Sequence, residues 1–309
     1  MSGLSERVTV AMPLTHLTRA GSARTCHLPR TAARSLSEPF LPHGEALMTD
    51  VTVASLNVRG VPLTGSRLAA RCQAIGAFFE ASDVDVACFQ EVHTYAHLAL
   101  LVRQMRSFRH VSFRRALPGP AGDVVTFSRV PVSSTAFRGF GPVTARIPWP
   151  ARLRARMKGA LVTRLTCPEA SVINTHPLAN TDGDWSEANR FFLAHRAQLA
   201  ALSGVVGGVP ASVVVCGDFN VDRDSALFSD FVSETGLDDA FEGRCPPTFR
   251  AEYLPAGARP RCIDFILTGG EVKAISAGVL FAGKQPLRGG PGYVSDHMGL
   301  CARLHVLDA

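Results

Sequence analysis

Polar side chains stand at the ends of several apolar, strand-like runs in this chain, and together they could do chemistry. Residues 213–220 read VVVCGDFN, so the apolar run stops at Gly217 and is followed by Asp218 and Asn220. Gly, Asp and Asn also serve turns, so this segment alone does not distinguish a turn from a site. The same placement recurs elsewhere along the chain, at Asn57, Glu91, His176, Asp264, Asp296 and His297.

These residue types share one chemistry. Carboxylates and carboxamides are hard oxygen donors that suit Mg²⁺ or Mn²⁺. Two histidines with spare carboxylates can orient and transfer protons. The sequence contains no cysteine cluster or H-E-x-x-H motif typical of zinc, and no Walker or G-x-G-x-x-G loop typical of nucleotide binding. Each residue alone also has a plain structural interpretation, such as a strand cap for Asn57 or a loop histidine for His176.

The elements that must position these residues alternate between short strands and amphipathic helices. Apolar residues at helical spacing predict helices near 68–79, 98–105, 186–203 and 225–235. The third of these has an inner stripe of Ala188, Phe192, His195, Leu199 and Leu202. Strands are expected at 51–57, 84–91, 108–113, 123–134, 159–166, 171–176, 212–220, 262–268 and 299–306. This pattern, without an internal linker, predicts one α/β domain with mixed sheets over 48–309.

Six motifs in a fixed order carry a resemblance to a known family. They are SLNVRG, FQEV, INTH, CGDFN, CIDFIL and SDHMGL, and they lie within residues 51–305. In this order they resemble the endonuclease/exonuclease/phosphatase superfamily, which includes deoxyribonuclease and the neutral sphingomyelinases. The resemblance implies a deoxyribonuclease-like four-layer α/β sandwich, in which two mixed β-sheets are flanked by helices. It also implies that the motif residues meet at one end of the sandwich.

The resemblance implies a metal site and a catalytic cluster. Glu91 would be the principal ligand of Mg²⁺, or of Mn²⁺ in its place, helped by Asn57 and Asp296. Asp218 would hold the attacking water and a phosphate oxygen, and it could also be a ligand at a second metal position. The remaining catalytic residues implied by the motifs are His176, Asn220, Asp264 and His297.

The resemblance also gives these catalytic residues roles. Asn220 would act with Asp218 on the water and the phosphate. Asp264 would contact His297, and that pair would serve as a general base or as a charged clamp on the phosphate. His176 would hydrogen-bond a phosphate oxygen or the leaving group.

The implied reaction is in-line attack of water on the phosphorus of a phosphodiester, in nucleic acid or in a phospholipid. The segment INTHPLAN resembles the deoxyribonuclease, sphingomyelinase and deadenylase branches more than the abasic-site endonucleases, and MKGALVTRL resembles the neutral sphingomyelinase branch. A non-catalytic phosphate- or nucleic-acid-binding module on the same fold is the alternative. That alternative predicts a missing ligand or catalytic residue, and none is missing from the motifs.

Bulk composition sets broader limits. The 309 residues are 46% hydrophobic and 19% charged, with a net charge of +6, which favours anionic partners. No run approaches the roughly 20 apolar residues that span a bilayer. Eight scattered cysteines without a C-x-x-C pair indicate free thiols in a reducing cytoplasm, with a Cys245–Cys262 bridge as the alternative. Nothing in the sequence implies a stable protein partner, so we expect a monomer.

Two segments stand apart from the motifs. Residues 1–47 lack periodicity, so we expect a disordered N-terminal extension, or a start codon placed too early with Met48 as the natural start. Residues 144–159 read TARIPWPARLRARMKG and combine Trp149 with several arginines. This segment reads either as a solvated basic loop or as a surface for a nucleic-acid backbone or an anionic membrane.

Overall fold

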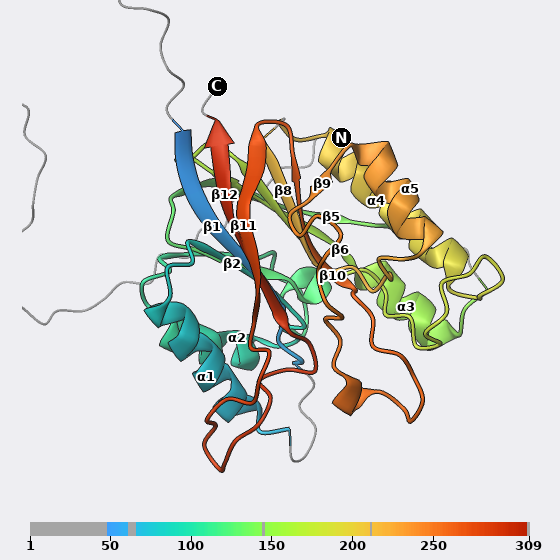
Figure 1. The fold of residues 1–309 in the computed structure, drawn as a ribbon, viewed down its shortest axis with the longest axis horizontal. Coiled ribbons are helices and arrows are strands. Elements are labelled where there is room, and N and C mark those ends of the chain that lie inside the picture. The colour runs from blue at the N-terminus through green and yellow to red at the C-terminus, as the bar shows by residue number, and fades with distance from the viewer. Residues whose placement is uncertain (1–47, 61–65, 144–145, 211, 308–309) are drawn as a thin grey trace, which may run out of the picture. The chain divides into compact units, whose positions relative to one another are not determined.

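The computed structural model of the chain describes residues 48–60, 66–143, 146–210 and 212–307. This part of the chain contains two six-stranded mixed sheets and five α-helices (Figure 1). The expectations for residues 1–47 lie outside the described residues. Among the described helices, none is long and apolar enough to cross a membrane.

The first sheet has the strand order β11-β12-β1-β2-β4-β3. Its central pair, β1 (Met48–Asn57) and β2 (Val86–Gln90), is parallel, so that Asn57 lies opposite Gln90 at one edge. The other pairs are antiparallel and involve β3 (His110–Ser112), β4 (Val125–Ser128), β11 (Val272–Leu280) and β12 (Gly299–Leu307). Helices α1 (Leu68–Ala81) and α2 (Tyr95–Gln104) cover one face of this sheet.

The second sheet has the strand order β5-β6-β7-β8-β10-β9. Its parallel pair is β7 (Ser171–Thr175) and β8 (Val213–Asp218), and the pairing sets Thr175 opposite Gly217. The other strands are β5 (Val132–Gly139), β6 (Gly159–Leu165), β9 (Asp238–Asp239) and β10 (Asp264–Gly269). Helices α4 (Phe192–Gly207) and α5 (Ala226–Thr235) lie on its outer side (Figure 1).

The two sheets pack face to face through an apolar core. Valines of β1 and β2 share this core with valines of β7 and β8. A buried amide pair also crosses it, because Gln90 Nε2 donates to Asn174 Oδ1 at 2.9 Å. Asn174 Nδ2 in turn donates to the carbonyls of Phe89 and Val125 in the opposite sheet. The layers are therefore helices, sheet, sheet and helices, and the predicted four-layer α/β sandwich is confirmed.

Helix α4 begins later than the sequence predicts. The expected helix over 186–203 starts only at Phe192, and Ala188 lies in a turn before it. Asp184 Oδ1 accepts from the backbone N–H of Ser186, and Asn189 Oδ1 accepts from that of Phe191. These local bonds offer the backbone an alternative to helical bonds, which explains the late start.

Helix α3 and the edge strands β9 and β11 were not predicted, and one predicted strand is divided. The basic segment expected as a loop contains α3 (Trp149–Met157), whose inward face consists only of Ala151 and Ala155. Strand β11 was missed because it is an edge strand with mostly exposed residues. The strand predicted over 123–134 is divided by Pro131, with β4 in the first sheet and β5 in the second.

Candidate active site

The ends of strands from both sheets meet in one cluster of polar side chains. Asn57 ends β1, Asp218 ends β8, and Glu91 follows β2. Asn57 Nδ2 donates to Glu91 Oε1 at 3.2 Å and to Asp218 Oδ2 at 2.9 Å. The carboxamide of Asn57 therefore joins two carboxylates that come from different sheets.

Asp264 and His297 lie on the far side of Asp218. The register of β8 and β10 places Asp264 directly opposite Asp218. Asp264 Oδ2 lies 2.9 Å from His297 Nδ1, and His297 Nε2 lies 3.6 Å from Asp218 Oδ2. Burial alone would lower the pKa of His297, but the carboxylates of Asp264 and Asp218 raise it to about 10. His297 is therefore a cation at neutral pH.

Backbone contacts fix the loop that carries His297. Ser295 Oγ donates to the carbonyl of Asn57 at 2.6 Å and accepts from the backbone N–H of His297 at 3.2 Å. The loop before β12 is thereby bonded to the last residue of β1. The imidazole consequently has a fixed position relative to the ends of both sheets.

His176 approaches Asp218 from the end of β7. Its Nε2 lies 3.6 Å from Asp218 Oδ2, and its Nδ1 lies 2.9 Å from Lys158 Nζ. A lysine ammonium can only donate, so Nδ1 must accept and Nε2 must carry the proton. Burial, assisted by the charge of Lys158, holds the pKa of His176 well below its usual value. His176 is therefore a neutral donor aimed at Asp218.

The backbone around Asp218 is sharply bent. Gly217 has φ 145°, and a Cβ there would lie 2.0 Å from the carbonyl oxygen of Thr175. Asn220 has φ 54°, and its backbone N–H donates to Asp218 Oδ1 at 2.9 Å. Burial raises the pKa of the Asp218 carboxyl to about 7, although the charge of His297 acts to lower it. Such a carboxyl can exchange a proton at neutral pH.

Glu91 offers an oxygen that a metal ion could take. Its Oε2 is buried and has no hydrogen-bond partner, while His93 Nε2 lies 3.6 Å away. Burial would raise the pKa of Glu91, but the ion pair with His93 and the other imidazoles nearby hold it well below its usual range. A permanently ionised carboxylate beside the amide of Asn57 fits Mg²⁺ or Mn²⁺ by its donor chemistry.

Asp296 has a different environment. Its Oδ2 lies 3.2 Å from Arg59 Nε, and its Oδ1 accepts from Ser295 Oγ at 3.2 Å. Within the described residues, the acid and histidine group with mutually close ligand atoms is Asp218, Asp264 and His297, all within 4.8 Å. His297 in that group already uses Nδ1 against Asp264 and carries a positive charge, so we interpret the group as a hydrogen-bonded cluster. The assignment of Asp296 to the metal stays a prediction.

The sequence did not single out two side chains that adjoin the cluster. His93 Nδ1 lies 3.2 Å from Asp123 Oδ1, and Lys158 Nζ lies 3.3 Å from Asp123 Oδ2. Burial would lower the pKa of His93, but the carboxylates of Asp123 and Glu91 raise it to about 9. His93 lies in a loop and Asp123 ends a short 3-10 helix before β4, so neither has the strand-end placement that marked the other residues.

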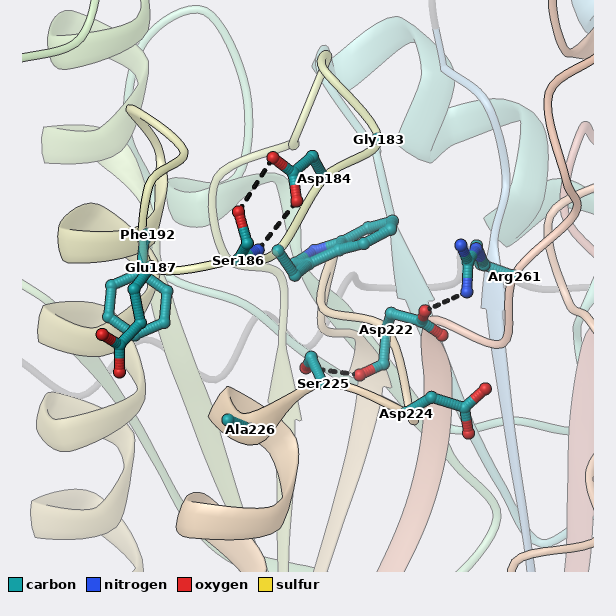
Figure 2. Close-up of a pocket in the computed structure, with 11 residues that line it drawn as sticks. Gly183, Asp184, Ser186, Glu187, Phe192, Asp222, Asp224, Ser225, Ala226 and Arg261 are labelled. Carbon is teal, nitrogen blue, oxygen red and sulfur yellow. Dashed lines mark hydrogen bonds and ion pairs between the residues drawn. The ribbon is translucent and has the colours of Figure 1, made fainter.

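A hollow of about 380 Å³ lies between the loop 183–187 and residues 222–226, which follow β8 along the chain (Figure 2). Trp185 lines it and donates from Nε1 to the carbonyl of Asn220 at 2.9 Å. Asp222 and Arg261 form an ion pair of 2.7 Å in its wall. Asp184 accepts two hydrogen bonds from Ser186, as Figure 2 shows.

Solved structures with the same fold come from several proteins. Beta toxin from Staphylococcus aureus has 17% identity and a TM-score of 0.63, covering 82% of this chain and 99% of that chain. TDP2 from D. rerio, complexed with a single-strand DNA product, has 16% identity and a TM-score of 0.63, covering 83% and 99%. Sphingomyelinase C from Streptomyces griseocarneus has 17% identity and a TM-score of 0.59, covering 82% and 99%.

The search of curated proteins returned no match. A family model described as Endonuclease/Exonuclease/phosphatase family matches residues 54–297. The matched range begins just before Asn57 and ends at His297, so it encloses the whole polar cluster. Together with the two packed mixed sheets, this match shows that the chain belongs to the endonuclease/exonuclease/phosphatase family.

Proposed function

We propose that this protein is a Mg²⁺-dependent phosphodiesterase that hydrolyses its substrate by in-line attack of water. One observation carries the proposal: Asp218 lies between two imidazole Nε2 atoms and the carboxamide of Asn57, where the ends of both sheets meet. Family membership supports it, because members of this family are mostly metal-dependent phosphoesterases.

Asn57 and Glu91, with Asp296, would hold the metal ion. The buried Glu91 Oε2, which lacks a hydrogen-bond partner, supports this choice. A structure of S. aureus beta toxin with bound magnesium ions favours Mg²⁺. When bound, such an ion supplies positive charge that stabilises the oxygens of the phosphate in the transition state.

Asp218 and Asn220 would position the attacking water and the phosphate. As the oxygen of water bonds to phosphorus, Asp218 takes the proton that the water loses. The ester oxygen departs with the electron pair of the broken P–O bond and takes a proton from solvent. The hydrogen bond from the Asn220 backbone to Asp218 Oδ1 leaves the other carboxylate oxygen facing the imidazoles.

The two histidines would bind the phosphate oxygens. His297 is fixed through Nδ1 by Asp264, so its Nε2 is left for the substrate, which favours a charged clamp over a general base. His176 presents an N–H from Nε2, because Lys158 fixes the other nitrogen as an acceptor. Such preorganised donors stabilise charge that develops in the transition state.

The substrate is proposed as a nucleic acid or a phospholipid. Both classes of substrate are represented by name among the structures of similar fold, in TDP2 with single-strand DNA and in sphingomyelinase C. The hollow beside Trp185 would receive a group attached to the phosphate, because Trp185 is bonded to the carbonyl of Asn220. All seven cysteines in the described residues are free thiols, Cys245 and Cys262 included.

A substrate panel tests the proposal. The full chain, stripped of metal and then supplied with Mg²⁺, is given supercoiled plasmid, single-stranded RNA, sphingomyelin vesicles and an inositol polyphosphate, beside a His297→Ala variant. Turnover that needs Mg²⁺ and is lost in the variant is the expected result, and the consumed substrate names the class. Absence of turnover on the whole panel, with Mg²⁺ bound, would contradict the proposal and favour a binding module.

A further inference from the structure

Helix α3, labelled in Figure 1, has exposed apolar side chains that the active site does not explain. Its inward face is narrow and made of Ala151 and Ala155, which pack in a small cluster with Ile147, Leu178 and Phe191. Alanines allow the helix to lie close to the protein. The large side chains of the helix must therefore point elsewhere.

Three large apolar side chains form a line on the outer face of α3. Trp149 is 74% exposed, Leu153 is 53% exposed and Met157 is 52% exposed. They recur every four residues, so they lie one above another on the helix surface. A helix that only serves its own core places large apolar residues inward, so this reversed arrangement indicates a partner that covers the outer face.

Arginines border this apolar line on both sides. At about 100° per residue, Arg152 and Arg156 lie on one side of it and Arg154 lies on the other. All three are exposed, and no carboxylate within the described residues forms an ion pair with them. Since α3 also contains no acidic residue, its outer face is apolar at the centre and cationic at both borders.

A hollow beside the helix combines the same two chemistries. It has a volume of about 260 Å³ and lies between Pro142, Trp149 and Leu153, with Arg152 and Arg156 in its wall. Apolar walls next to guanidinium groups match a molecule that joins hydrocarbon to phosphate.

The helix is also tied to the proposed active site. Gln198 accepts from the backbone N–H of Leu178 at 2.8 Å and donates to the carbonyl of Ala155 at 3.2 Å. Lys158, the residue directly after the helix, places its Nζ 2.9 Å from His176 Nδ1. Because β6 starts opposite the end of β7, α3 adjoins the same edge of the sheet as the catalytic cluster.

We propose that α3 docks the protein on an anionic phospholipid surface. Trp149, Leu153 and Met157 enter the interfacial region of the bilayer, while the arginines pair with lipid phosphates. This combination of aromatic, aliphatic and cationic side chains is typical of helices that lie in a membrane interface. A nucleic acid fits less well, since Leu153 and Met157 offer no ring on which a base could stack.

Vesicle binding tests this inference without any catalysis, so its outcome is separate from that of the proposed phosphodiesterase. The full chain in EDTA is sedimented with vesicles of phosphatidylcholine alone, or with about a third phosphatidylserine. We expect binding only to the anionic vesicles, weakening with salt. Replacing Arg152, Arg154 and Arg156 with Gln should weaken vesicle binding roughly fivefold per arginine. The double variant Trp149→Ser with Leu153→Ser should also weaken vesicle binding, because it removes apolar contact with the bilayer.

Matched controls separate the helix from general surface effects. Leu193→Ser removes a leucine with the same 53% exposure from α4, and Gln at Arg103, Arg106 and Arg109 removes three exposed arginines elsewhere. Both controls should bind as the parent does, and unchanged melting temperatures would show that the α3 variants are folded. The inference would be overturned if the parent protein did not bind anionic vesicles, or if the α3 variants bound them as well as the parent. It would also be overturned if the α3 changes weakened only the binding of single-stranded oligonucleotides.

Discussion

Asn57 Nδ2 donates to Asp218 Oδ2 at 2.9 Å, and this bond joins the last residue of β1 in one sheet to the last residue of β8 in the other. The same nitrogen also donates to Glu91 Oε1. A single neutral side chain thus spaces the carboxylate proposed as metal ligand from the carboxylate proposed as base. The site depends on how the two sheets pack as well as on either sheet alone.

Replacing Asn57 should therefore lower the stability of the fold. Asn57→Ala leaves two buried carboxylate oxygens without this donor, which we expect to cost roughly 1–3 kcal/mol in the free energy of unfolding. Urea unfolding in EDTA measures that loss, with Ser229→Ala on the exposed face of α5 as control. Equal midpoints for Asn57→Ala and the parent would show that the bond between the sheets contributes nothing.

Glu91→Gln tests the proposed metal ligand. The change keeps the shape of the side chain but removes its charge, so we expect Mg²⁺ affinity to fall by at least about tenfold. Isothermal titration calorimetry measures the affinity, and Glu169→Gln, on an exposed loop residue, should leave it unchanged. If Glu91→Gln bound Mg²⁺ as tightly as the parent, Glu91 would be excluded as a metal ligand.

The buried His97 should make stability depend on pH. Its side chain is 1% exposed, and burial lowers the pKa of the imidazole to about 4, against about 6.5 in an unfolded chain. Between these pH values His97 is protonated in the unfolded state and neutral in the folded state. The free energy of unfolding therefore falls as pH drops, by up to about 1.4 kcal/mol per pH unit. His97→Gln should flatten this slope in urea titrations at pH 4.5 to 7, whereas an unchanged slope would exclude His97 as its source.

Alanine substitutions at Gly217 and Gly204 should have opposite effects on stability. At Gly217 a Cβ would collide with the backbone of Thr175 at φ 145°, so Gly217→Ala should destabilise the fold by more than about 1 kcal/mol. Gly204 lies inside α4 with nothing within 4 Å of a Cβ, so Gly204→Ala should stabilise by about 0.5–1 kcal/mol. Thermal melting of both variants measures the two signs, and a stabilising Gly217→Ala would contradict the close approach of β7 and β8.

Much of the fold could be predicted from the sequence, because its strands are apolar and its motifs stand at their ends. The buried runs of β2 and β8 and the regular stripe of α1 gave clear periodicities. Helix α3 was missed because its inward residues are two alanines and its large apolar residues face outward. The start of α4 was misplaced because side-chain bonds in 184–191 replace helical bonds, and spacing alone does not reveal them.

Part of the candidate active site could also be predicted from the sequence. Strand-end residues such as Asn57 and Asp218 were visible because apolar runs point to them. His93 and Asp123 were not, because their proximity depends on a loop and on Glu91, whose backbone adopts φ 60° after β2. The pairing of Lys158 with His176 likewise arises from the antiparallel register of β6 and β7.

The proposed Mg²⁺-dependent hydrolysis is tested by the rate of phosphodiester cleavage as Mg²⁺ is added back to metal-free protein, for the parent and for Asp218→Asn. With bis(p-nitrophenyl) phosphate as a general substrate, we expect turnover that appears only with Mg²⁺. Loss of the proposed base should lower that turnover by roughly 10²–10⁴-fold in Asp218→Asn. Turnover that is independent of Mg²⁺, or equal in the two proteins, would contradict the proposal.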